Sequence, residues 1–375
     1  MPPVNVLIKP ASSACNMRCA YCFYRDVSEH REQAFTGMLP PERMEEIICA
    51  AVESAEESCT FAFQGGEPTL AGLDFFRQVV QLEEKHAKPG ITMQNTIQTN
   101  GLGITEEWAA FLSQNHFLVG LSLDGPGEIH DRNRVDVQGR GTFAPVMETV
   151  KLFDRYGVEY NILCVVTGRN ARSIGKIYHF FKKHNFGWLQ FIPCMEPLDG
   201  ERGDTPFHLS PEQYGDFLVR LFDLWYADLC QGIYVSIRHL DNWLGILLGQ
   251  PPEACNMAGH CSIQFVVEGD GGVYPCDFYA TDRWRLGTVG EQSFAAMAQG
   301  ERAAEFVKAS FAVPAECRAC PVYALCRNGC RRDRAEKDGV PGKNYYCEAY
   351  RRFFRERNRE LVRAAQIILR MRGGR

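Results

Sequence analysis

Apolar residues in the first 200 positions follow two alternating periodicities. Short runs rich in β-branched and aromatic residues, typical of buried parallel strands, are separated by longer stretches with helical spacing. After Pro41, for example, Met44, Ile47, Ile48 and Ala51 follow the i, i+3, i+4, i+7 pattern of one helix face. This pattern predicts strands over 4–8, 60–63, 92–98, 118–122, 160–166 and 189–192, and helices over 41–57, 75–86, 106–115, 145–156, 171–184 and 211–231.

Six strand–helix units with short connections predict an α/β fold. Their sheet would be parallel, either open or closed into a partial (β/α)6 barrel like part of a TIM barrel. In such folds the chemistry lies at the carboxyl ends of the strands. From residue 255 onward Cys, Gly, Pro and Arg predominate, with short hairpin-like strands such as 264–268. We therefore predict two domains, the partial barrel over 1–235 and a cysteine-rich domain with a C-terminal helix over 236–375.

Composition limits the classes of protein to be considered. The 375 residues are 45% hydrophobic, which is enough for a large core, and the net charge is −5. That charge balance gives no general electrostatic reason to bind nucleic acid or an anionic membrane. The first residues do not resemble a signal peptide, and no stretch approaches the ~18 apolar residues of a membrane span. We expect a cytoplasmic protein.

The chain contains 16 Cys, which is unusual for a cytoplasmic protein. A reducing compartment disfavours disulfides, so clustered Cys there indicate metal binding or redox chemistry. Eleven Cys form two groups, one near the N-terminus and one after residue 254. The other five, which lie mostly in apolar surroundings and are predicted to be buried and inert, are Cys49, Cys59, Cys164, Cys194 and Cys230.

The first group follows the first predicted strand. Cys15, Cys19 and Cys22 have the spacing C-x3-C-x2-C. A cubane of four irons and four sulfides normally takes four Cys, so three leave one iron open to a small chelating ligand. Zinc is the alternative, but structural zinc needs four ligands and the nearest histidine is His30.

This spacing, with an aromatic residue before the last Cys, resembles the signature of the radical S-adenosylmethionine superfamily. The resemblance implies that S-adenosylmethionine chelates the open iron and is cleaved to a 5′-deoxyadenosyl radical. The stretch Gln64-Gly65-Gly66-Glu67-Pro68 resembles the glycine motif that meets the cofactor's amino group. Taken alone, residues 64–68 would be interpreted as an ordinary glycine turn, Ser122 as a turn cap and Arg134 as a partner in a surface ion pair. The cofactor-binding residues that the resemblance implies are Tyr21, Gly66, Ser122, Arg134 and Met195.

The second group contains eight Cys, which equals two sets of four ligands. Its spacing is C-x5-C-x9-G-x4-C, then C-x2-C-x5-C-x3-C, then a final C. Two fully ligated cubanes would suit electron transfer or structure, and a pair of zinc ribbons is the alternative. The spacing resembles the SPASM extension of radical enzymes that modify peptides. That resemblance implies one auxiliary cluster on Cys255, Cys261, Cys276 and Cys330, and another on Cys317, Cys320, Cys326 and Cys347.

Over nearly its whole length the chain resembles the anaerobic sulfatase-maturating enzymes of clostridial type. Residues 7–13, 61–73, 98–101, 161–167 and 273–279 carry this resemblance. It implies oxidation of a Cys or Ser in an unfolded sulfatase to formylglycine, with three 4Fe-4S clusters and S-adenosylmethionine as cofactors. Asp277 would be the catalytic base, and Tyr24 and Gln64 would contact the substrate. We also expect a reduced flavodoxin- or ferredoxin-like electron donor and a monomeric enzyme that binds neither nucleic acid nor membrane.

Three other interpretations compete with this one. A radical maturase of a small ribosomal peptide would share the cofactors, but the early first strand leaves no room for an N-terminal peptide-recognition domain. A non-enzymatic zinc-binding module would not need the 64–68 motif. The basic tail over 351–375 suggests membrane or nucleic-acid binding. Its apolar positions instead predict a docked helix with a solvated charged face, namely Phe353, Phe354, Leu361, Ile367 and Leu369.

Overall fold

The computed structural model describes residues 3–199, 201–337 and 340–373, and its fold comprises two compact units. Neither unit is a continuous stretch of chain. The first unit consists of Met1–Leu123, His130–Asn161 and Ile263–Phe306, and the second of Asp124–Ile129, Ile162–Ser262 and Val307–Arg375. The assignment of 1–235 and 236–375 to two domains is a different division, based on motifs, and it stays a prediction.

The first unit is built on a mostly parallel sheet. Four consecutive strands, β1 to β4, lie side by side and run parallel. On the other side of β1, β8 pairs in parallel, and β9 and β10 follow as antiparallel neighbours. The strands are β1 (Val4–Ile8), β2 (Ser58–Phe63), β3 (Thr92–Thr99), β4 (Leu118–Ser122), β8 (Val266–Val267), β9 (Gly272–Tyr274) and β10 (Gly287–Thr288).

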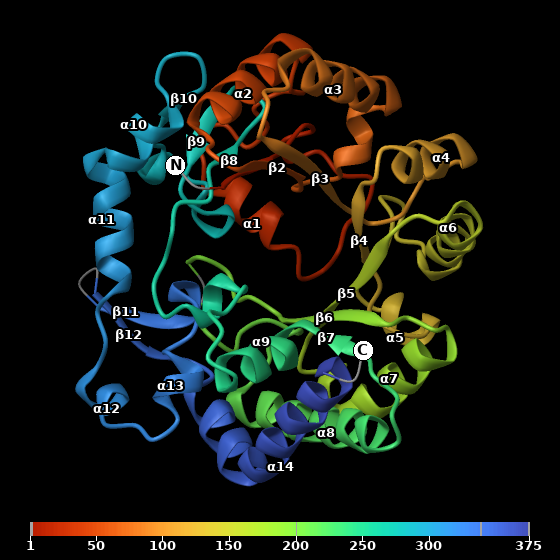
Figure 1. The fold of residues 1–375 in the computed structure, drawn as a ribbon, viewed down its shortest axis with the longest axis vertical. Coiled ribbons are helices and arrows are strands. Elements are labelled where there is room, and N and C mark those ends of the chain that lie inside the picture. The colour runs from red at the N-terminus through yellow and green to blue at the C-terminus, as the bar shows by residue number, and fades with distance from the viewer. Residues whose placement is uncertain (1–2, 200, 338–339, 374–375) are drawn as a thin grey trace. The chain divides into compact units, whose positions relative to one another are not determined.

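Helices connect these strands and bury their apolar faces. α2 begins at Pro41, which suits a first helical position, and buries Met44, Ile47, Ile48 and Ala51 as the periodicity predicts. It lies beside α3, as Figure 1 shows at the top of the view. The helices whose residues fall mainly in this unit are α1 (Phe23–Glu29), α2 (Pro41–Ser54), α3 (Leu73–His86), α4 (Glu106–Gln114), α6 (Phe143–Tyr156), α10 (Phe294–Gln299) and α11 (Glu301–Ser310).

The second unit contains the remaining parallel strands and a set of packed helices. β5, β6 and β7 run parallel in that order. α8 begins with a reciprocal capping box between Ser210 and Gln213, and Pro211 takes its first position. The elements are β5 (Tyr160–Val166), β6 (Trp188–Pro193), β7 (Ser236–Ile237), β11 (Arg334–Lys337), β12 (Val340–Asn344), α7 (Ile174–Lys183), α8 (Pro211–Cys230), α9 (Arg238–Leu247), α12 (Ala315–Arg318), α13 (Tyr323–Cys326) and α14 (Cys347–Gly373).

Residues 351–373 of the basic tail belong to α14, which packs along α8 and against α9 (Figure 1), and residues 374–375 lie outside the described residues. Phe353, Phe354 and Leu361 are buried, and the Phe353 ring stacks on Trp243 with centroids 4.9 Å apart. The predicted docked helix is therefore confirmed. Leu369 is wrong as a member of the buried face, because the helical repeat turns it outward and it is 50% exposed.

The α/β class and every predicted strand and helix over 1–231 are present, with end points shifted by a few residues. Among the five Cys outside the two groups, Cys59, Cys164 and Cys194 are buried and Cys49 is half-buried. The prediction is wrong for Cys230, which is exposed at the end of α8.

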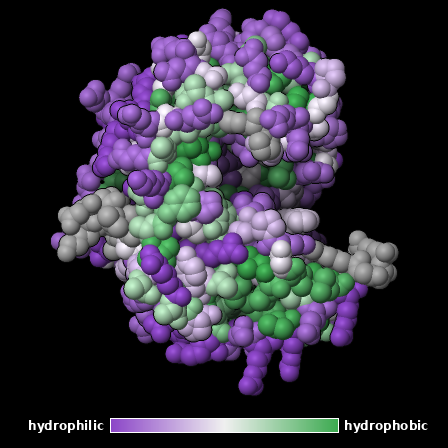
Figure 2. All heavy atoms as spheres, turned by 60° about the vertical axis from the view of Figure 1, so that its left-hand side comes forward, coloured by the Kyte–Doolittle hydropathy of each residue, from purple (hydrophilic) through white to green (hydrophobic). Residues whose placement is uncertain are grey.

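Hydrophilic residues, drawn in purple, cover much of the molecular surface that Figure 2 shows. Among the described residues, no helix has the length and apolar character of a membrane span.

Candidate active site

The three N-terminal Cys lie on the loop between β1 and α1. The loop is pinned by backbone hydrogen bonds from Arg18 N–H to Val135 C=O (2.8 Å) and from Ala20 N–H to Asn133 C=O (2.9 Å). Burial raises the pKa of the Cys15 thiol to about 12, and the charges of Glu67, Cys19 and Cys22 push it the same way.

Polar groups point at these sulfurs. Asn100 Nδ2 donates to Cys15 Sγ at 3.7 Å, and Arg134 Nη1 donates to Cys19 Sγ at 3.9 Å. Donors and positive charge near sulfur favour thiolate ligands. No group of three or more His, Cys, Asp or Glu side chains in the described ranges is arranged to hold a single metal ion. Three thiols with polar groups aimed at two of them are the donor chemistry that an iron–sulfur cubane takes.

The Gly65-Gly66-Glu67 motif ties the cysteine loop to the ends of β2 and β3. Glu67 N–H donates to Ala14 C=O at 2.8 Å, and the buried Glu67 carboxylate accepts from Thr99 Oγ1 and Asn100 N–H, both at 2.8 Å. Burial raises the pKa of Glu67, and these hydrogen bonds oppose the shift. A Cβ on Gly66 would collide with the carbonyl oxygen of Ala14, so the loops can meet only at a glycine.

The other predicted cofactor residues divide between the units. In the first unit, Ser122 Oγ at the end of β4 accepts from Gln98 Nε2 at 3.1 Å. The buried Arg134 guanidinium lies over the Tyr21 ring, 5.7 Å from its centroid. The structure therefore brings Tyr21 and Arg134 to the Cys19 side of the cysteine loop. Met195 follows β6 in the second unit, and its role stays a prediction.

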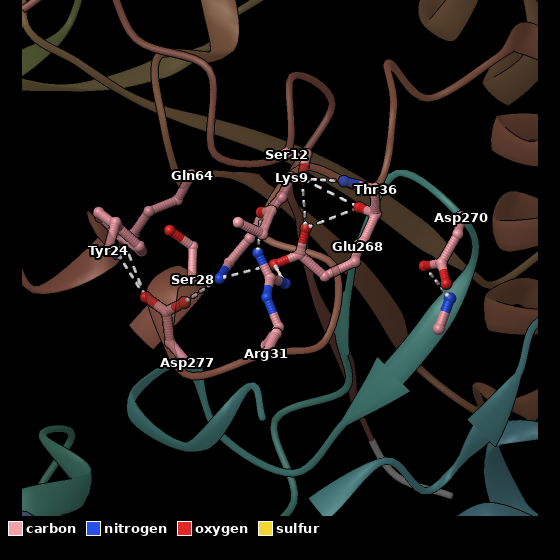
Figure 3. A network of polar contacts seen from close by, with 12 residues as sticks. Lys9, Ser12, Tyr24, Ser28, Arg31, Thr36, Gln64, Glu268, Asp270 and Asp277 are labelled. Atoms are coloured by element: carbon pink, nitrogen blue, oxygen red, sulfur yellow. Dashed lines mark hydrogen bonds and ion pairs between the residues drawn. The ribbon is translucent and has the colours of Figure 1, made fainter. Parts of the chain in front are cut away.

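Asp277, Tyr24 and Gln64 form one hydrogen-bonded group, although they come from three distant parts of the sequence (Figure 3). The Tyr24 hydroxyl donates to Asp277 Oδ2 at 2.7 Å, and Gln64 Nε2 lies 3.4 Å from the same oxygen and donates to the Tyr24 hydroxyl. Asp277 itself is buried. The predicted base and both predicted substrate contacts therefore lie side by side.

Two further charged residues complete this group, and neither was predicted from the sequence. Lys9 Nζ lies 3.1 Å from Asp277 Oδ1 and 3.1 Å from Glu268 Oε1, and Glu268 also pairs with Arg31. Burial alone would lower the pKa of Lys9, but the carboxylates of Asp277 and Glu268 raise it above its ordinary value. The sequence feature that could have identified them is a charged residue directly after an apolar run, as in 4–9 and 266–268.

Strand register explains why these side chains meet. β8, β1 and β2 are parallel neighbours, with Ile8 opposite both Val267 and Phe63. One residue further on, Glu268, Lys9 and Gln64 leave the three strands at the same edge. Lys9 N–H still donates to Val267 C=O, and Gln64 N–H to Ile8 C=O, both at 2.9 Å. The carboxyl edge of the sheet thus carries the polar residues, as parallel α/β folds predict.

The second unit holds seven of the eight C-terminal Cys. Burial and then neighbouring thiols raise the pKa of Cys326, where the thiols are those of Cys347, Cys317 and Cys320. Burial likewise raises the pKa of Cys330, with the charges of Cys255 and Cys261 adding to the shift. Cys276 lies in the first unit. The ligand pairing that the SPASM resemblance implies stays a prediction.

Arg334 supports the loops between these Cys. Its guanidinium donates to the carbonyl oxygens of Ser310 (2.7 Å), Gly329 (2.8 Å), Asn328 (3.0 Å) and Gly259 (3.1 Å). Cys261 N–H donates to Ser310 Oγ at 2.8 Å, which joins the same network. A buried cation therefore ties together segments on either side of the thiols, as supporting residues around metal sites do.

Known proteins place this arrangement in a family. The family profile of the Radical SAM superfamily matches residues 10–181, and that of the SPASM iron–sulfur cluster-binding domain matches residues 255–321. The cysteine-type anaerobic sulfatase-maturating enzyme of Clostridium perfringens (strain 13 / Type A) is 47% identical over 98% of this chain and 100% of its own length. The chain belongs to the anaerobic sulfatase-maturating enzymes. It is therefore an S-adenosylmethionine-dependent iron–sulfur enzyme, as the resemblance of its cysteine motif implied.

Other members of this family, and a solved structure of one, are also similar to this chain. A cysteine-type family member from Clostridium novyi (strain NT) is 45% identical over 98% of this chain and 99% of its own length. A serine-type member from Bacteroides thetaiotaomicron is 32% identical over 94% of this chain and 89% of its own length. The solved structure of native anSMEcpe with bound AdoMet and Cp18Cys peptide matches with a TM-score of 0.94 and 46% identity, covering 98% of this chain and 100% of that one. Membership in this enzyme family contradicts a non-enzymatic zinc module.

Proposed function

We propose that this enzyme oxidises a Cys, or a Ser, in the active-site motif of an unfolded sulfatase to Cα-formylglycine under anaerobic conditions. The observation that carries the proposal is the buried Asp277 carboxylate, which has Tyr24 and Gln64 on one oxygen and lies directly after Cys276. A cysteine substrate is the better supported of the two. The two relatives with identities of 45% or more described above are cysteine-type, whereas the serine-type relative is 32% identical.

Cys15, Cys19 and Cys22 would hold the cluster that binds S-adenosylmethionine, with Tyr21, Gly66, Ser122, Arg134 and Met195 as cofactor contacts. Cys255, Cys261, Cys276 and Cys330, and Cys317, Cys320, Cys326 and Cys347, would hold the two auxiliary clusters. When bound, these groups supply a radical that takes one hydrogen atom from the substrate Cβ, and a sink for the remaining electron.

The chain's own residues supply the proton chemistry. Removing two electrons from the Cys side chain also requires its thiol proton to leave, and Asp277 Oδ2 would accept that proton. Tyr24 and Gln64 both reach Oδ2, so they would orient the thiol against it. Water would then add to the resulting thioaldehyde carbon and the sulfur would leave as hydrogen sulfide, which gives the aldehyde. With a Ser substrate the same proton transfer would give the aldehyde directly.

The decisive experiment combines iron–sulfur reconstitution with a peptide assay. The anaerobically reconstituted enzyme is incubated with S-adenosylmethionine, a chemical reductant and a peptide that carries the sulfatase motif with Cys or with Ser. We expect deoxyadenosine release together with the peptide mass of the aldehyde. Deoxyadenosine release with an unchanged peptide would refute the maturase function while leaving the radical chemistry intact.

Asp277→Asn tests the base. The amide keeps the shape of the carboxylate but cannot accept the proton, so peptide oxidation should fall by a factor of about 100 or more. Deoxyadenosine release should remain within a few-fold of the wild-type rate. Asp282→Asn removes an exposed carboxylate a short way along the same segment and serves as the control. Equal loss of both activities in Asp277→Asn would contradict a role as base.

We further propose a cytoplasmic location, because free thiols on this scale persist only in a reducing compartment. A reduced flavodoxin- or ferredoxin-like protein would be the electron donor, and the enzyme would act as a monomer. Sedimentation of the reconstituted enzyme tests the last point directly.

A further inference from the structure

The stem of Lys9 lies across Gly65 of the cofactor motif. Gly65 has φ +111°, and a Cβ added there would lie 2.6 Å from Lys9 Cγ and 2.7 Å from Lys9 Cδ. Real Cβ atoms do not approach so closely, so any side chain at position 65 must displace the lysine. The first glycine of the pair therefore makes room for Lys9, whereas Gly66 makes room for the cysteine loop.

The ammonium group of Lys9 is held from two sides (Figure 3). Asp277 Oδ1 lies 3.1 Å from Lys9 Nζ, and so does Glu268 Oε1. Glu268 is itself fixed, because Arg31 pairs with Oε1 and Ser12 Oγ donates to Oε2 at 3.1 Å. Among the described side chains, this buried cluster contains two cations, those of Lys9 and Arg31, and two carboxylates, those of Glu268 and Asp277. Their charges balance one another without solvent.

We propose that Lys9 is the positioning residue for Asp277. By engaging Oδ1, Lys9 leaves Oδ2 as the oxygen that faces Tyr24 and Gln64. Gly65 then acts indirectly, because it keeps the space through which the lysine reaches the carboxylate. This inference rests on the proposed function, in which Asp277 Oδ2 receives the substrate proton.

Lys9→Met tests the ammonium group while keeping most of the stem. Without its cation, Asp277 loses the contact that orients it, and a displacement of about 1 Å at a reacting group can cost ~100-fold in rate. We expect kcat for peptide oxidation to fall between about tenfold and about 100-fold, with little change in the KM of the peptide. Deoxyadenosine release should stay within about twofold, so more deoxyadenosine forms per oxidised peptide.

Lys9→Arg restores the positive charge and should recover part of the coupling, which a purely space-filling role would not produce. Lys9→Met also leaves Glu268 with one cation fewer and can impair folding. The charge-balanced double variant K9M/E268Q avoids that problem and should show the same uncoupling.

Gly65→Ala tests whether the Lys9 side chain needs the space at position 65 to reach Asp277. It should raise the amount of deoxyadenosine formed per oxidised peptide, as Lys9→Met does, even if the rate of deoxyadenosine release also falls because position 65 belongs to the cofactor motif. The two substitutions together should raise that ratio no more than the worse of them alone, because both act on one contact. Gly72→Ala is the matched control. Gly72 also has a positive φ, +86°, but apart from its chain neighbours no atom of the described residues lies within 4 Å of its added Cβ, so this variant carries the backbone strain without the collision.

The outcomes separate the two proposals. If the wild-type enzyme leaves the peptide unchanged, the proposed function fails. If the wild type oxidises the peptide and both Lys9→Met and K9M/E268Q keep normal coupling, the Lys9 inference is wrong and the function stands. Parallel loss of deoxyadenosine release and peptide oxidation in both variants would also overturn the inference, as would additive effects of Lys9→Met and Gly65→Ala.

Discussion

Glu67 shows how one residue of a cofactor motif can act on the protein rather than on the ligand. Its carboxylate accepts hydrogen bonds from the N–H and Oγ1 of Thr69, from Thr99 Oγ1 and from Asn100 N–H. A carboxylate presents only acceptors, so it can meet four donors at once. Asn100 in turn donates to Cys15 Sγ, which links the motif to the cysteine loop.

Glu67→Gln should therefore be damaging despite its small change in size. The glutamine amide brings a donor to a position surrounded by donors, and an unsatisfied buried group costs about 1–3 kcal/mol. We expect a lower unfolding midpoint and weaker binding of S-adenosylmethionine, measured by thermal melting and equilibrium binding. Glu84→Gln, on the exposed surface of α3, is the control, and an unchanged melting temperature for Glu67→Gln would contradict the bracing role.

At the scale of elements, the contact between α3 and β3 contains an unusual carboxyl group. Glu83 of α3 is buried, and Asn95 Nδ2 of β3 donates to its Oε2 at 2.8 Å. The other carboxyl oxygen and Asn95 Oδ1 have no hydrogen-bond partner among the described residues. Burial raises the pKa of Glu83 to about 7, so protonation would give Asn95 Oδ1 a donor.

The sign of the pH effect follows from this raised pKa. Below the ordinary pKa of a glutamate, Glu83 is protonated in both the folded and the unfolded chain, and its contribution to the free energy of unfolding is complete. It is lost as the pH rises through about 7, where the folded chain must ionise a buried group. Glu83→Gln keeps a donor at every pH. We expect it to raise the stability by roughly 1–3 kcal/mol at about pH 8, with little effect near pH 5.

Thermal unfolding of the reconstituted enzyme at several pH values checks this expectation. The difference in midpoint between Glu83→Gln and wild type should grow as the pH rises from the ordinary range of a glutamate to about 7 and should then level off, because both folded and unfolded chains are ionised there above that pH. A constant difference would mean that Glu83 does not titrate in this range, and the exposed Glu84→Gln again controls for the loss of one negative charge.

At the scale of the whole molecule, each compact unit is assembled from three separate stretches of chain. Residues 263–306 pack with the N-terminal stretch, because β8 pairs with β1 and thereby delivers Asp277 to the carboxyl edge of that sheet. Seven of the eight C-terminal Cys lie in the second unit and Cys276 lies in the first. The residues of each unit are thus gathered from distant stretches rather than in sequence order, and the predicted cluster ligands follow that arrangement.

Iron content tests that organisation. Three cubanes predict about twelve irons per reconstituted chain. Cys15→Ala and Cys320→Ala should each lower the count by about four, because each removes one ligand of a different cubane, and only Cys15→Ala should abolish deoxyadenosine release. Cys230→Ser, at an exposed thiol outside both groups, should leave the iron content unchanged. A normal count in Cys320→Ala would contradict its assignment as a ligand.

The sequence by itself determined the α/β class and the six strands and six helices that were predicted between residues 4 and 231, because apolar periodicity is a property of neighbouring residues. It indicated the enzyme family through the resemblance of its cysteine spacing and other motifs to known proteins. It also indicated Asp277, Tyr24 and Gln64, although only through the family resemblance.

Only the tertiary structure decided which charges share the site. Lys9 and Glu268 come from distant parts of the sequence, and the parallel register of β8 with β1 brings them together. The sequence also could not show why residue 65 is a glycine, because the reason is the position of the Lys9 side chain, which comes from another strand. A local sequence pattern cannot predict such contacts, because they form only after distant strands have paired.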